Sequence, residues 1–243
     1  DKALLSTEVA SGAEKAELLI VIPAYNEAEN IERVVNHLTA NFPQYDYVVV
    51  NDGSRDETAA ICQRNGYNLL NLPVNLGLAG AFQAGLKYAD KYGYQYAVQL
   101  DGDGQHRPEY LESMIKKMEE GYDIVIGSRF VGEKKPFTMR MLGSNLIEMA
   151  IRFTTGVNIK DPTSGMRMFS KRMIREFASG LNYGPEPDTV SYLIRQGARV
   201  AEVPVIMDER ILGVSYLTPV NAMRYILKML ISILLIQNFR KRR

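Results

Sequence analysis

Two acidic side chains stand one residue apart in a glycine-rich stretch, Asp101-Gly102-Asp103-Gly104, directly after an apolar run. Glycine lets the backbone turn sharply, so both carboxylates can be directed toward one point. Carboxylate oxygens are the hard ligands that Mg²⁺ and Mn²⁺ prefer, and such an ion usually completes its shell with phosphate oxygens. An ion held here would stabilise a departing nucleoside diphosphate. We therefore predict that Asp101 and Asp103 bind a metal ion that acts on phosphate.

The same stretch has two other interpretations. Asp and Gly are common in turns, so the stretch is compatible with an acidic surface turn. A calcium loop is the second, because four residues have the required offsets: Asp101, Asp103, Gln105 and Glu112. However, His106 stands where that loop needs glycine, and a strand, not a helix, is predicted before it. The interpretation as a metal site for phosphate is therefore favoured.

Apolar runs separated by turn residues predict strands that alternate with helices over the first half of the chain. The expected strands are 18–22, 47–50, 68–72, 96–100 and 124–126. This order is typical of a mostly parallel, doubly wound sheet, which binds ligands at the carboxyl ends of its strands. Polar clusters stand at three of these ends: 25–27, 51–54 and 101–106. The sequence thus predicts a ligand site at that edge of the sheet.

Local signals also predict where helices begin. Residues 26–29, and Ser54 with Glu57, resemble capping boxes of the helices that follow the first two strands. The second half is less regular and is expected to hold a long helix and two strands, at 139–155, 166–169 and 200–206.

Composition narrows the class of protein. The 243 residues suffice for one large α/β domain. Because 29 Lys and Arg nearly balance 28 Asp and Glu, no overall field indicates a nucleic-acid partner. Cys62 is the one cysteine, which excludes an internal disulfide and fits a reducing, cytoplasmic location. Residues 1–17 lack the pattern of a secretory signal and are expected to be a flexible arm or a remnant of cloning.

Several segments, in consistent order, resemble a known family. The segments Val21–Glu27, Val50–Ser54, Asp101–Asp103 and Gly127–Arg129 are similar to those of family 2 glycosyltransferases with the GT-A fold. Asp161–Arg167 resembles the branch that contains dolichol-phosphate mannose synthase and bacterial polyprenyl-phosphate glycosyltransferases. The resemblance implies a Rossmann-like, mostly parallel mixed sheet flanked by helices, and glycosyl transfer by direct displacement with inversion at the sugar carbon.

The resemblance also implies roles for individual residues. It implies nucleotide-binding residues at Pro23, Tyr25, Glu27, Asp52, Asn75, Gly77, Ala79 and Asp101. It implies metal ligands, for Mg²⁺ or Mn²⁺, at Asp101, Asp103 and Gln105. It implies a catalytic set of Asp103, Arg129, Asp161 and Arg167, in which the two arginines face phosphate because guanidinium stays charged and binds bidentately.

The role of Asp161 depends on the acceptor. A sugar hydroxyl is a poor nucleophile near neutral pH, so Asp161 or Asp188 would have to remove its proton. A lipid phosphate is already ionised, with a second pKa of about 6, so Asp161 would instead orient Arg167 or the acceptor. For Glu186 and Asp188 a helix N-terminal role is favoured. His106 is a candidate phosphate contact.

The C-terminal stretch has the pattern of an amphipathic helix. From Pro219 onward, apolar residues recur at helical spacing, with Arg224 and Lys228 on the other side, which predicts an amphipathic helix. With the basic residues 240–243, this helix is expected to lie at a membrane interface. The alternative is that it packs on its own sheet or on another subunit. No run reaches the roughly 20 apolar residues of a spanning helix. The polyprenyl-phosphate enzymes that the chain resembles often continue into such helices, so the resemblance makes contact with a separate membrane protein a further expectation.

These observations lead to one principal expectation. A catalytic domain at 18–216, followed by an interfacial helix at 217–243, would transfer a hexosyl group from a UDP- or GDP-sugar to a polyprenyl phosphate at the cytoplasmic membrane face. The alternative acceptor is a sugar hydroxyl of a lipid-linked oligosaccharide or surface polysaccharide. A dinucleotide-dependent oxidoreductase is disfavoured, because the first strand lacks the glycine fingerprint. A catalytically silent module that binds membrane surfaces is the remaining class.

Overall fold

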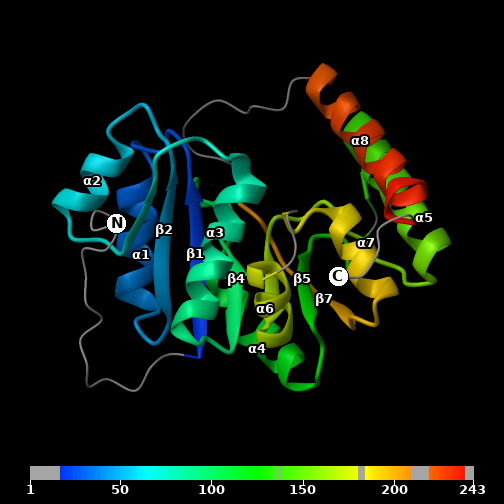
Figure 1. Cartoon of the computed structure of the whole chain (residues 1–243), viewed down its shortest axis with the longest axis horizontal. Helices are drawn as coiled ribbons and strands as arrows, with labels where there is room; N and C mark the ends of the chain where they lie inside the picture. Colours follow the sequence, from blue (N-terminus) through cyan, green and yellow to red (C-terminus); the bar gives the residue numbers. More distant parts are fainter. Residues whose placement is uncertain (1–16, 134, 137, 180–183, 209–218, 239–243) are drawn as a thin grey trace. The chain divides into compact units, whose positions relative to one another are not determined.

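The computed structural model describes residues 17–133, 135–136, 138–179, 184–208 and 219–238. The chain falls into two compact units. The first unit comprises Asp1–Pro108, Met168–Gly184 and Asp208–Gly213, and the second comprises Glu109–Arg167, Pro185–Met207 and Val214–Arg243. Each unit is an arrangement of strands and flanking helices (Figure 1).

The strands of the first unit form its centre. They are β1 (Leu18–Ala24), β2 (Asp46–Asp52), β3 (Leu69–Leu72), β4 (Tyr96–Gln99) and β6 (Arg167–Ser170), of which Arg167 itself belongs to the second unit. The pairs β1–β2, β2–β3 and β1–β4 are parallel, with Val21 opposite Val48 and Ile20 opposite Val98. β6 runs antiparallel to β4. Parallel pairing brings the carboxyl ends of β1, β2 and β4 to one edge, as predicted.

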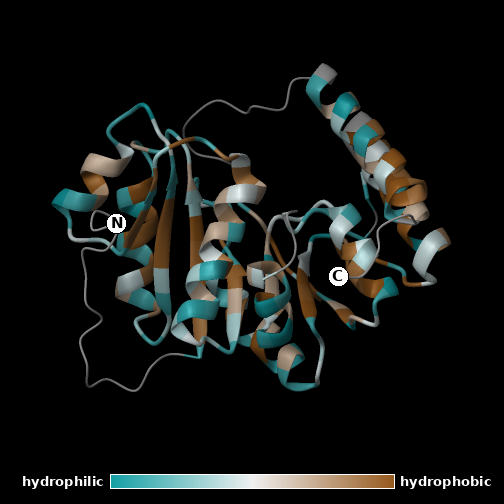
Figure 2. Ribbon diagram, viewed as in Figure 1, coloured by the Kyte–Doolittle hydropathy of each residue, from teal (hydrophilic) through white to brown (hydrophobic). Residues whose placement is uncertain are grey.

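Helices cover these strands because their apolar faces need burial. The helices of the first unit are α1 (Ile31–Asn41), α2 (Thr58–Arg64), α3 (Gly77–Tyr92) and α6 (Lys171–Ser179). Every residue of β1 is buried, and the strand is mostly hydrophobic (Figure 2). α3 approaches β1 closely at Gly85, where an added Cβ atom would overlap Val21. Glycine at this position therefore permits close packing of helix on strand.

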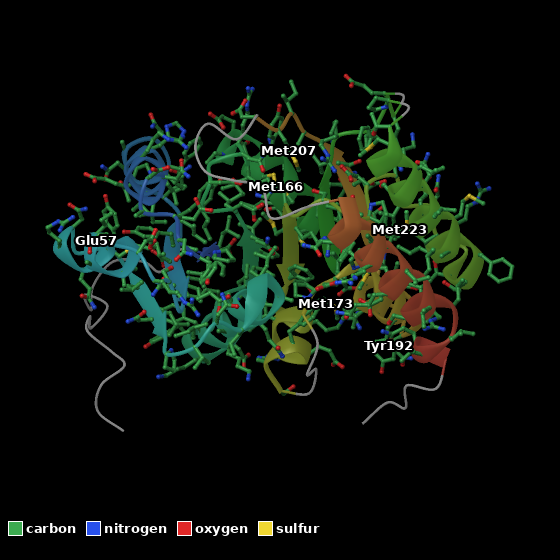
Figure 3. All side chains as sticks on the ribbon, turned by 90° about the horizontal axis from the view of Figure 1, so that it is seen from above. Glu57, Met166, Met173, Tyr192, Met207 and Met223 are labelled. Atoms are coloured by element: carbon green, nitrogen blue, oxygen red, sulfur yellow. The ribbon has the colours of Figure 1, made fainter. Side chains whose placement is uncertain are left out.

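The second unit pairs β5 (Ile124–Ser128) in parallel with β7 (Val200–Pro204). Its helices are α4 (Leu111–Glu119), α5 (Met139–Thr155), α7 (Pro187–Arg195) and α8 (Pro219–Leu234), with short 3₁₀ turns at η1 (Pro108–Tyr110) and η2 (Ile236–Asn238). Gly127 of β5 lies against Met166, with an added Cβ 3.1 Å from its Sδ (Met166 is labelled in Figure 3). α5 and α8 lie side by side, because Gly143 leaves room for Ile226.

The predicted fold class is confirmed: in the described residues, seven strands and flanking helices make a mixed α/β protein. The predicted strand at 166–169 begins one residue later, and that at 200–206 ends at Pro204. The two predicted capping boxes are wrong. α1 has Asn30 and α2 has Glu57 at the N-cap, and neither side chain makes a capping hydrogen bond. Within the described ranges, no helix has both the length and the apolar character to cross a bilayer.

Candidate active site

The loop after β4, Asp101–Arg107, holds the two predicted metal-binding carboxylates. Asp103 is buried, and its Oδ1 accepts a hydrogen bond from the backbone N–H of Gln105 at 3.0 Å. Gln99 Nε2 donates to Asp101 Oδ1 at 2.9 Å. Gly104 has a φ of +80° and donates its N–H to the Asp101 carbonyl at 3.2 Å. The glycine therefore allows the tight turn that places both carboxylates in one loop.

His106 closes the same loop. Its Nδ1 accepts a hydrogen bond from the backbone N–H of Asp101 at 3.0 Å, and its Nε2 lies 3.6 Å from Asp101 Oδ2. The ring is buried. Both nitrogens face Asp101, so the geometry does not favour the predicted contact between His106 and phosphate.

A second set of contacts fastens this loop to Asp208. Gln105 Nε2 donates to the Asp208 carbonyl at 3.2 Å, and the Asp208 N–H donates to the Gln105 carbonyl at 2.9 Å. Arg107 Nε donates to both carboxylate oxygens of Asp208 at 2.9 Å. The hydrogen bonds from Arg107 lower the pKa of Asp208. The hydrogen bond from its amide nitrogen to Asp208 thus sets the orientation of the side chain of Gln105, a predicted metal ligand.

The donor set of this loop fits a hard divalent ion. Two carboxylates and one carboxamide oxygen stand within five residues, and such groups suit Mg²⁺ and Mn²⁺. The part of the chain that the structure describes holds no cluster of three or more His, Cys, Asp and Glu side chains with metal-site geometry. A Mg²⁺ ion usually takes several of its ligands from phosphate or water, so one or two carboxylates suffice to hold it.

The predicted nucleotide-binding residues at the end of β1 and just after it lie next to the loop Asp101–Arg107, called the metal loop below. A Cβ atom at Gly102 would stand 3.1 Å from the Pro23 carbonyl oxygen and 3.6 Å from Glu27 Cγ. Glu27 is buried, and its Oε2 accepts a hydrogen bond from Asn30 Nδ2 at 2.8 Å. Tyr25 is partly exposed. Glycine at 102 therefore lets the metal loop approach the Pro23–Glu27 segment.

The loop after β1 is fastened to the loop after β2. Asn26 has a φ of +56°, a conformation that Asn tolerates better than most residues. Its N–H donates to Ser54 Oγ at 3.0 Å, and its Oδ1 accepts from the Arg55 N–H at 2.9 Å. The Glu27 N–H donates to Thr58 Oγ1 at 2.9 Å. Asn26 and Ser54 therefore join two loops and do not cap helices, which is why the predicted capping boxes fail.

Asp56 completes that junction. Its carboxylate accepts hydrogen bonds from the Ala28 N–H at 3.1 Å and from the Thr58 N–H at 3.0 Å. Burial opposes ionisation of this carboxyl, but the hydrogen bonds from Thr58 and Ala28 outweigh it and lower the pKa of Asp56.

Asp52, Asn75 and Gly77 form the third part of the predicted nucleotide pocket. Asp52 is buried at the end of β2, and its Oδ1 accepts from the Leu76 N–H at 2.7 Å. Asn75 Oδ1 accepts from the Gly77 N–H at 3.1 Å. Gly77 has a φ of +76°, where a side chain would be strained. The first turn of α3 is thus held at the end of β2. Ala79, one turn along, packs against Gly184.

In the second unit, Asp161 and Arg129 form an ion pair in which the carboxylate is buried and the arginine is partly exposed. Asp161 has 0% exposure, and Arg129 donates to it twice, from Nε at 2.8 Å and from Nη2 at 2.9 Å. The backbone N–H of Asp161 donates to Glu202 of β7 at 2.8 Å. Arg129 stands at the end of β5, so β5, β7 and the Asp161 loop together set the position of the guanidinium.

Arg167 is the most deeply buried cation of the predicted site. Its Nη1 donates to the Pro185 carbonyl, and its Nη2 donates to the Pro162 carbonyl at 2.6 Å. Within the described residues, Arg167 Nε and Glu186 Oε2 are buried without a hydrogen-bond partner. Burial lowers the pKa of Arg167, although nearby Tyr225 and the carboxylates oppose the shift. The expectation that Asp161 orients Arg167 is not reflected in these contacts, since Asp161 binds Arg129.

Asp188 performs the structural role favoured for it. Its Oδ1 accepts from the Thr189 N–H at 2.8 Å in the first turn of α7. Its Oδ2 accepts from Ser232 Oγ at 2.6 Å and Gln237 Nε2 at 3.2 Å. The sequence offered no signal for these two partners, because each is a single polar residue in an apolar segment.

Comparisons with known proteins agree with this arrangement. Residues 19–177 match the family model described as glycosyl transferase family 2. Polyprenol monophosphomannose synthase of Mycolicibacterium smegmatis is 32% identical over 216 residues, which cover 84% of this chain and 82% of that protein. Undecaprenyl-phosphate mannosyltransferase of Micrococcus luteus is 31% identical over 210 residues, which cover 82% of this chain and 86% of that protein.

Solved structures share the fold at lower identity. Glucosyl-3-phosphoglycerate synthase from Mycobacterium tuberculosis, in complex with Mn²⁺, UDP-glucose and phosphoglyceric acid, has a TM-score of 0.69 at 18% identity, covering 93% of this chain and 80% of that one. A mannosyltransferase from Pyrobaculum calidifontis, in complex with GDP-mannose and Mn²⁺, has a TM-score of 0.64 at 19% identity, covering 94% of this chain and 66% of that one.

Proposed function

Since the chain belongs to glycosyl transferase family 2, we propose that it transfers a hexosyl group from a UDP- or GDP-sugar to a polyprenyl phosphate, with inversion at the sugar carbon. The observation that carries the choice of acceptor is the ion pair of Asp161 and Arg129. Asp161 is fully buried and committed through both oxygens to one guanidinium. With no exposed surface and both oxygens bound to Arg129, Asp161 is poorly placed to reach the proton of a sugar hydroxyl, whereas a phosphate acceptor needs no base.

On the donor side, we assign the nucleotide pocket to the three joined loops of the first unit. Pro23, Tyr25 and Glu27 would line it, and Asp52 and Asn75 would define its edge through the first turn of α3. Asp101 and Asp103, with Gln105, would hold Mg²⁺ or Mn²⁺. That ion would neutralise charge on the departing nucleoside diphosphate. Asp52, Asp103 and Glu27 are buried and hydrogen-bonded within these loops, which holds the three carboxylates in fixed positions and supports this assignment.

For the acceptor, we assign phosphate binding to Arg129 and Arg167. Asp161 fixes the orientation of the Arg129 guanidinium group, and two backbone carbonyls fix that of the Arg167 guanidinium group. The buried Nε of Arg167, which has no partner among the described residues, is the kind of donor that an acceptor oxygen would satisfy. A guanidinium held in advance loses little side-chain entropy on binding an anion.

No observation favours the sugar-hydroxyl alternative. It requires a carboxylate that is able to take a proton, and the two candidates named for it are Asp161 and Asp188. Asp188 is also buried, and both of its oxygens accept hydrogen bonds from Thr189, Ser232 and Gln237. A base in this position would have to give up structural bonds first.

We further propose peripheral contact with a membrane through α5 and α8. α8 buries Met229 and Ile233 against its own unit, yet its opposite side exposes large apolar residues. Met223, labelled in Figure 3, and Leu227 are each 58% exposed. α5 adds a stripe of its own: Leu142, Leu146, Met149 and Phe153. Exposed apolar side chains on adjoining helices support an interfacial role.

Charge also supports this membrane contact. Arg152 of α5 and Arg224 and Lys228 of α8 are exposed beside the apolar residues, where cations attract anionic head groups. The basic residues 240–243, predicted to assist, lie outside the described residues. We propose that α5 and α8 contact the inner face of the cell membrane or a separate membrane protein.

The experiment is transfer of label from a panel of donors to undecaprenyl phosphate in detergent with Mn²⁺. We expect one donor among UDP-glucose, UDP-N-acetylglucosamine and GDP-mannose to yield an organic-extractable glycolipid, and Asp103→Asn to yield none. A second reaction offers an oligosaccharide in place of the lipid. Label in the oligosaccharide without any glycolipid, across all donors, would overturn the choice of acceptor.

A further inference from the structure

We propose that His106 is a positioning residue that holds the Asp101 carboxylate in the orientation needed to ligate the divalent ion. The inference rests on the metal site of the proposed function and deepens it. His106 itself does not touch the ion or the donor in this assignment. Its two ring nitrogens act on the two parts of Asp101, the backbone and the carboxylate.

The first step concerns the tautomer of the ring. A backbone N–H is only a donor, so the 3.0 Å contact from the Asp101 N–H requires an unprotonated Nδ1. In a neutral imidazole the proton then resides on Nε2. The same nitrogen faces Asp101 Oδ2 at 3.6 Å. The hydrogen bond from the Asp101 N–H to Nδ1 therefore places the proton of the neutral ring on Nε2, the nitrogen that faces the Asp101 carboxylate.

The second step concerns the other carboxylate oxygen. Gln99 Nε2 donates to Asp101 Oδ1 at 2.9 Å. Gln99 and His106 thus approach Asp101 from two directions, one at each oxygen, and both are buried, at 5% and 7% exposure. Each oxygen keeps a second lone pair for a metal. Groups that contact a metal-binding side chain in this way orient it, and their mutation typically costs 10- to 100-fold in metal affinity.

The third step concerns the loop as a whole. His106 stands five residues after Asp101, so the bond from the Asp101 N–H to the ring closes the loop that contains Asp103 and Gln105. The ring therefore restrains the loop and the carboxylate at once. The restraint on the loop and the restraint on the carboxylate can be separated with asparagine. The Asn side-chain oxygen lies near the position of Nδ1, and asparagine has no group at the position of Nε2.

The test measures Mn²⁺ binding by electron paramagnetic resonance, with UDP or GDP present and without sugar or acceptor. We expect His106→Asn, which keeps the loop-closing acceptor but loses the donor to Asp101, to bind Mn²⁺ about 10-fold more weakly. His106→Leu, which loses both contacts, should be weaker still. His37→Asn is the matched control, since His37 is the other histidine of the chain and lies on α1, bonded to Asn41. It should bind Mn²⁺ as the wild type does.

A second measurement uses the wild type and needs no variant to fold. Imidazole ¹⁵N spectra should show His106 with its proton on Nε2, and addition of Mg²⁺ with nucleotide should shift Nε2 more than Nδ1. A proton on Nδ1, or wild-type Mn²⁺ affinity in His106→Asn, would overturn the inference and leave the proposed function standing. If the wild type itself binds no Mn²⁺ with either nucleotide, the metal site and the inference both fail.

Discussion

Asp161 lies completely buried against Arg129 and is bound to it through both carboxylate oxygens, at 2.8 and 2.9 Å. Removing one partner of a fully buried ion pair typically costs 3–5 kcal/mol, but the Arg129 side chain is 24% exposed, so solvent reduces this cost. Asp161→Asn should therefore lower the free energy of unfolding by about 2 kcal/mol. Urea denaturation measures this loss.

The same variant tests the role of Asp161 in transfer. If Asp161 only positions Arg129, Asp161→Asn should raise the KM for the lipid phosphate more than it lowers kcat. The acidic limb of the pH profile of kcat should then remain. Glu202→Gln, which keeps an acceptor for the Asp161 N–H, is the control and should have a smaller effect. Loss of the acidic limb in Asp161→Asn would instead identify Asp161 as a general base.

Asp103→Asn should reduce transfer at least 1000-fold, an order-of-magnitude expectation for removal of a group that stabilises transition-state charge. The fold should persist, because the amide retains an oxygen that accepts from the Gln105 N–H. Asp90→Asn, at an exposed acid near the end of α3, is the matched control. Chelation of the metal by EDTA should likewise abolish activity, and Mn²⁺ should restore it. Near-normal transfer by Asp103→Asn would remove the metal role assigned to this carboxylate.

The lowered pKa of Asp56 predicts a specific pH dependence of stability. Since the pKa of the folded state lies below the unfolded value of about 3.9, ionised Asp56 stabilises the fold above that value. This contribution is lost as the pH falls through the folded pKa. The difference in unfolding free energy between wild type and Asp56→Asn should thus be full at pH 7 and shrink toward pH 2. A difference that stays constant over this range would mean that the charge of Asp56 contributes nothing.

Phe153→Ala and Leu227→Ala should each weaken binding to anionic vesicles, by roughly 10-fold, because transfer of a large apolar side chain out of water is worth about 1.5–3 kcal/mol. Donor hydrolysis without lipid should not change. Ile206→Ala is the control, since Ile206 is 61% exposed but lies outside α5 and α8. Vesicle cosedimentation measures the binding. Equal loss in all three variants, or in none, would contradict the assignment of this surface.

Much of the fold and part of the site were predictable from local patterns. Strand positions followed from apolar runs, and Asp101–Asp103 followed from two acids among glycines at a strand end. His106 was visible as a residue but not as a partner of Asp101, because the sequence does not show that the loop folds back on itself. The role of Asp208 could not be predicted from local patterns, because it depends on contacts with Gln105 and Arg107, which lie about a hundred residues earlier.

The amino-acid sequence alone determined the alternation of strands and helices, the polar ends of the strands and the chemistry of the metal loop, because each of these depends on neighbouring residues. Only the tertiary structure decided which polar groups meet. It paired Asp161 with Arg129, joined Asn26 to Ser54 in place of two helix caps, and directed both nitrogens of His106 at Asp101. The physical reason is that a buried polar group must find a partner, and that partner is set by the packing of strands and loops, not by proximity along the chain.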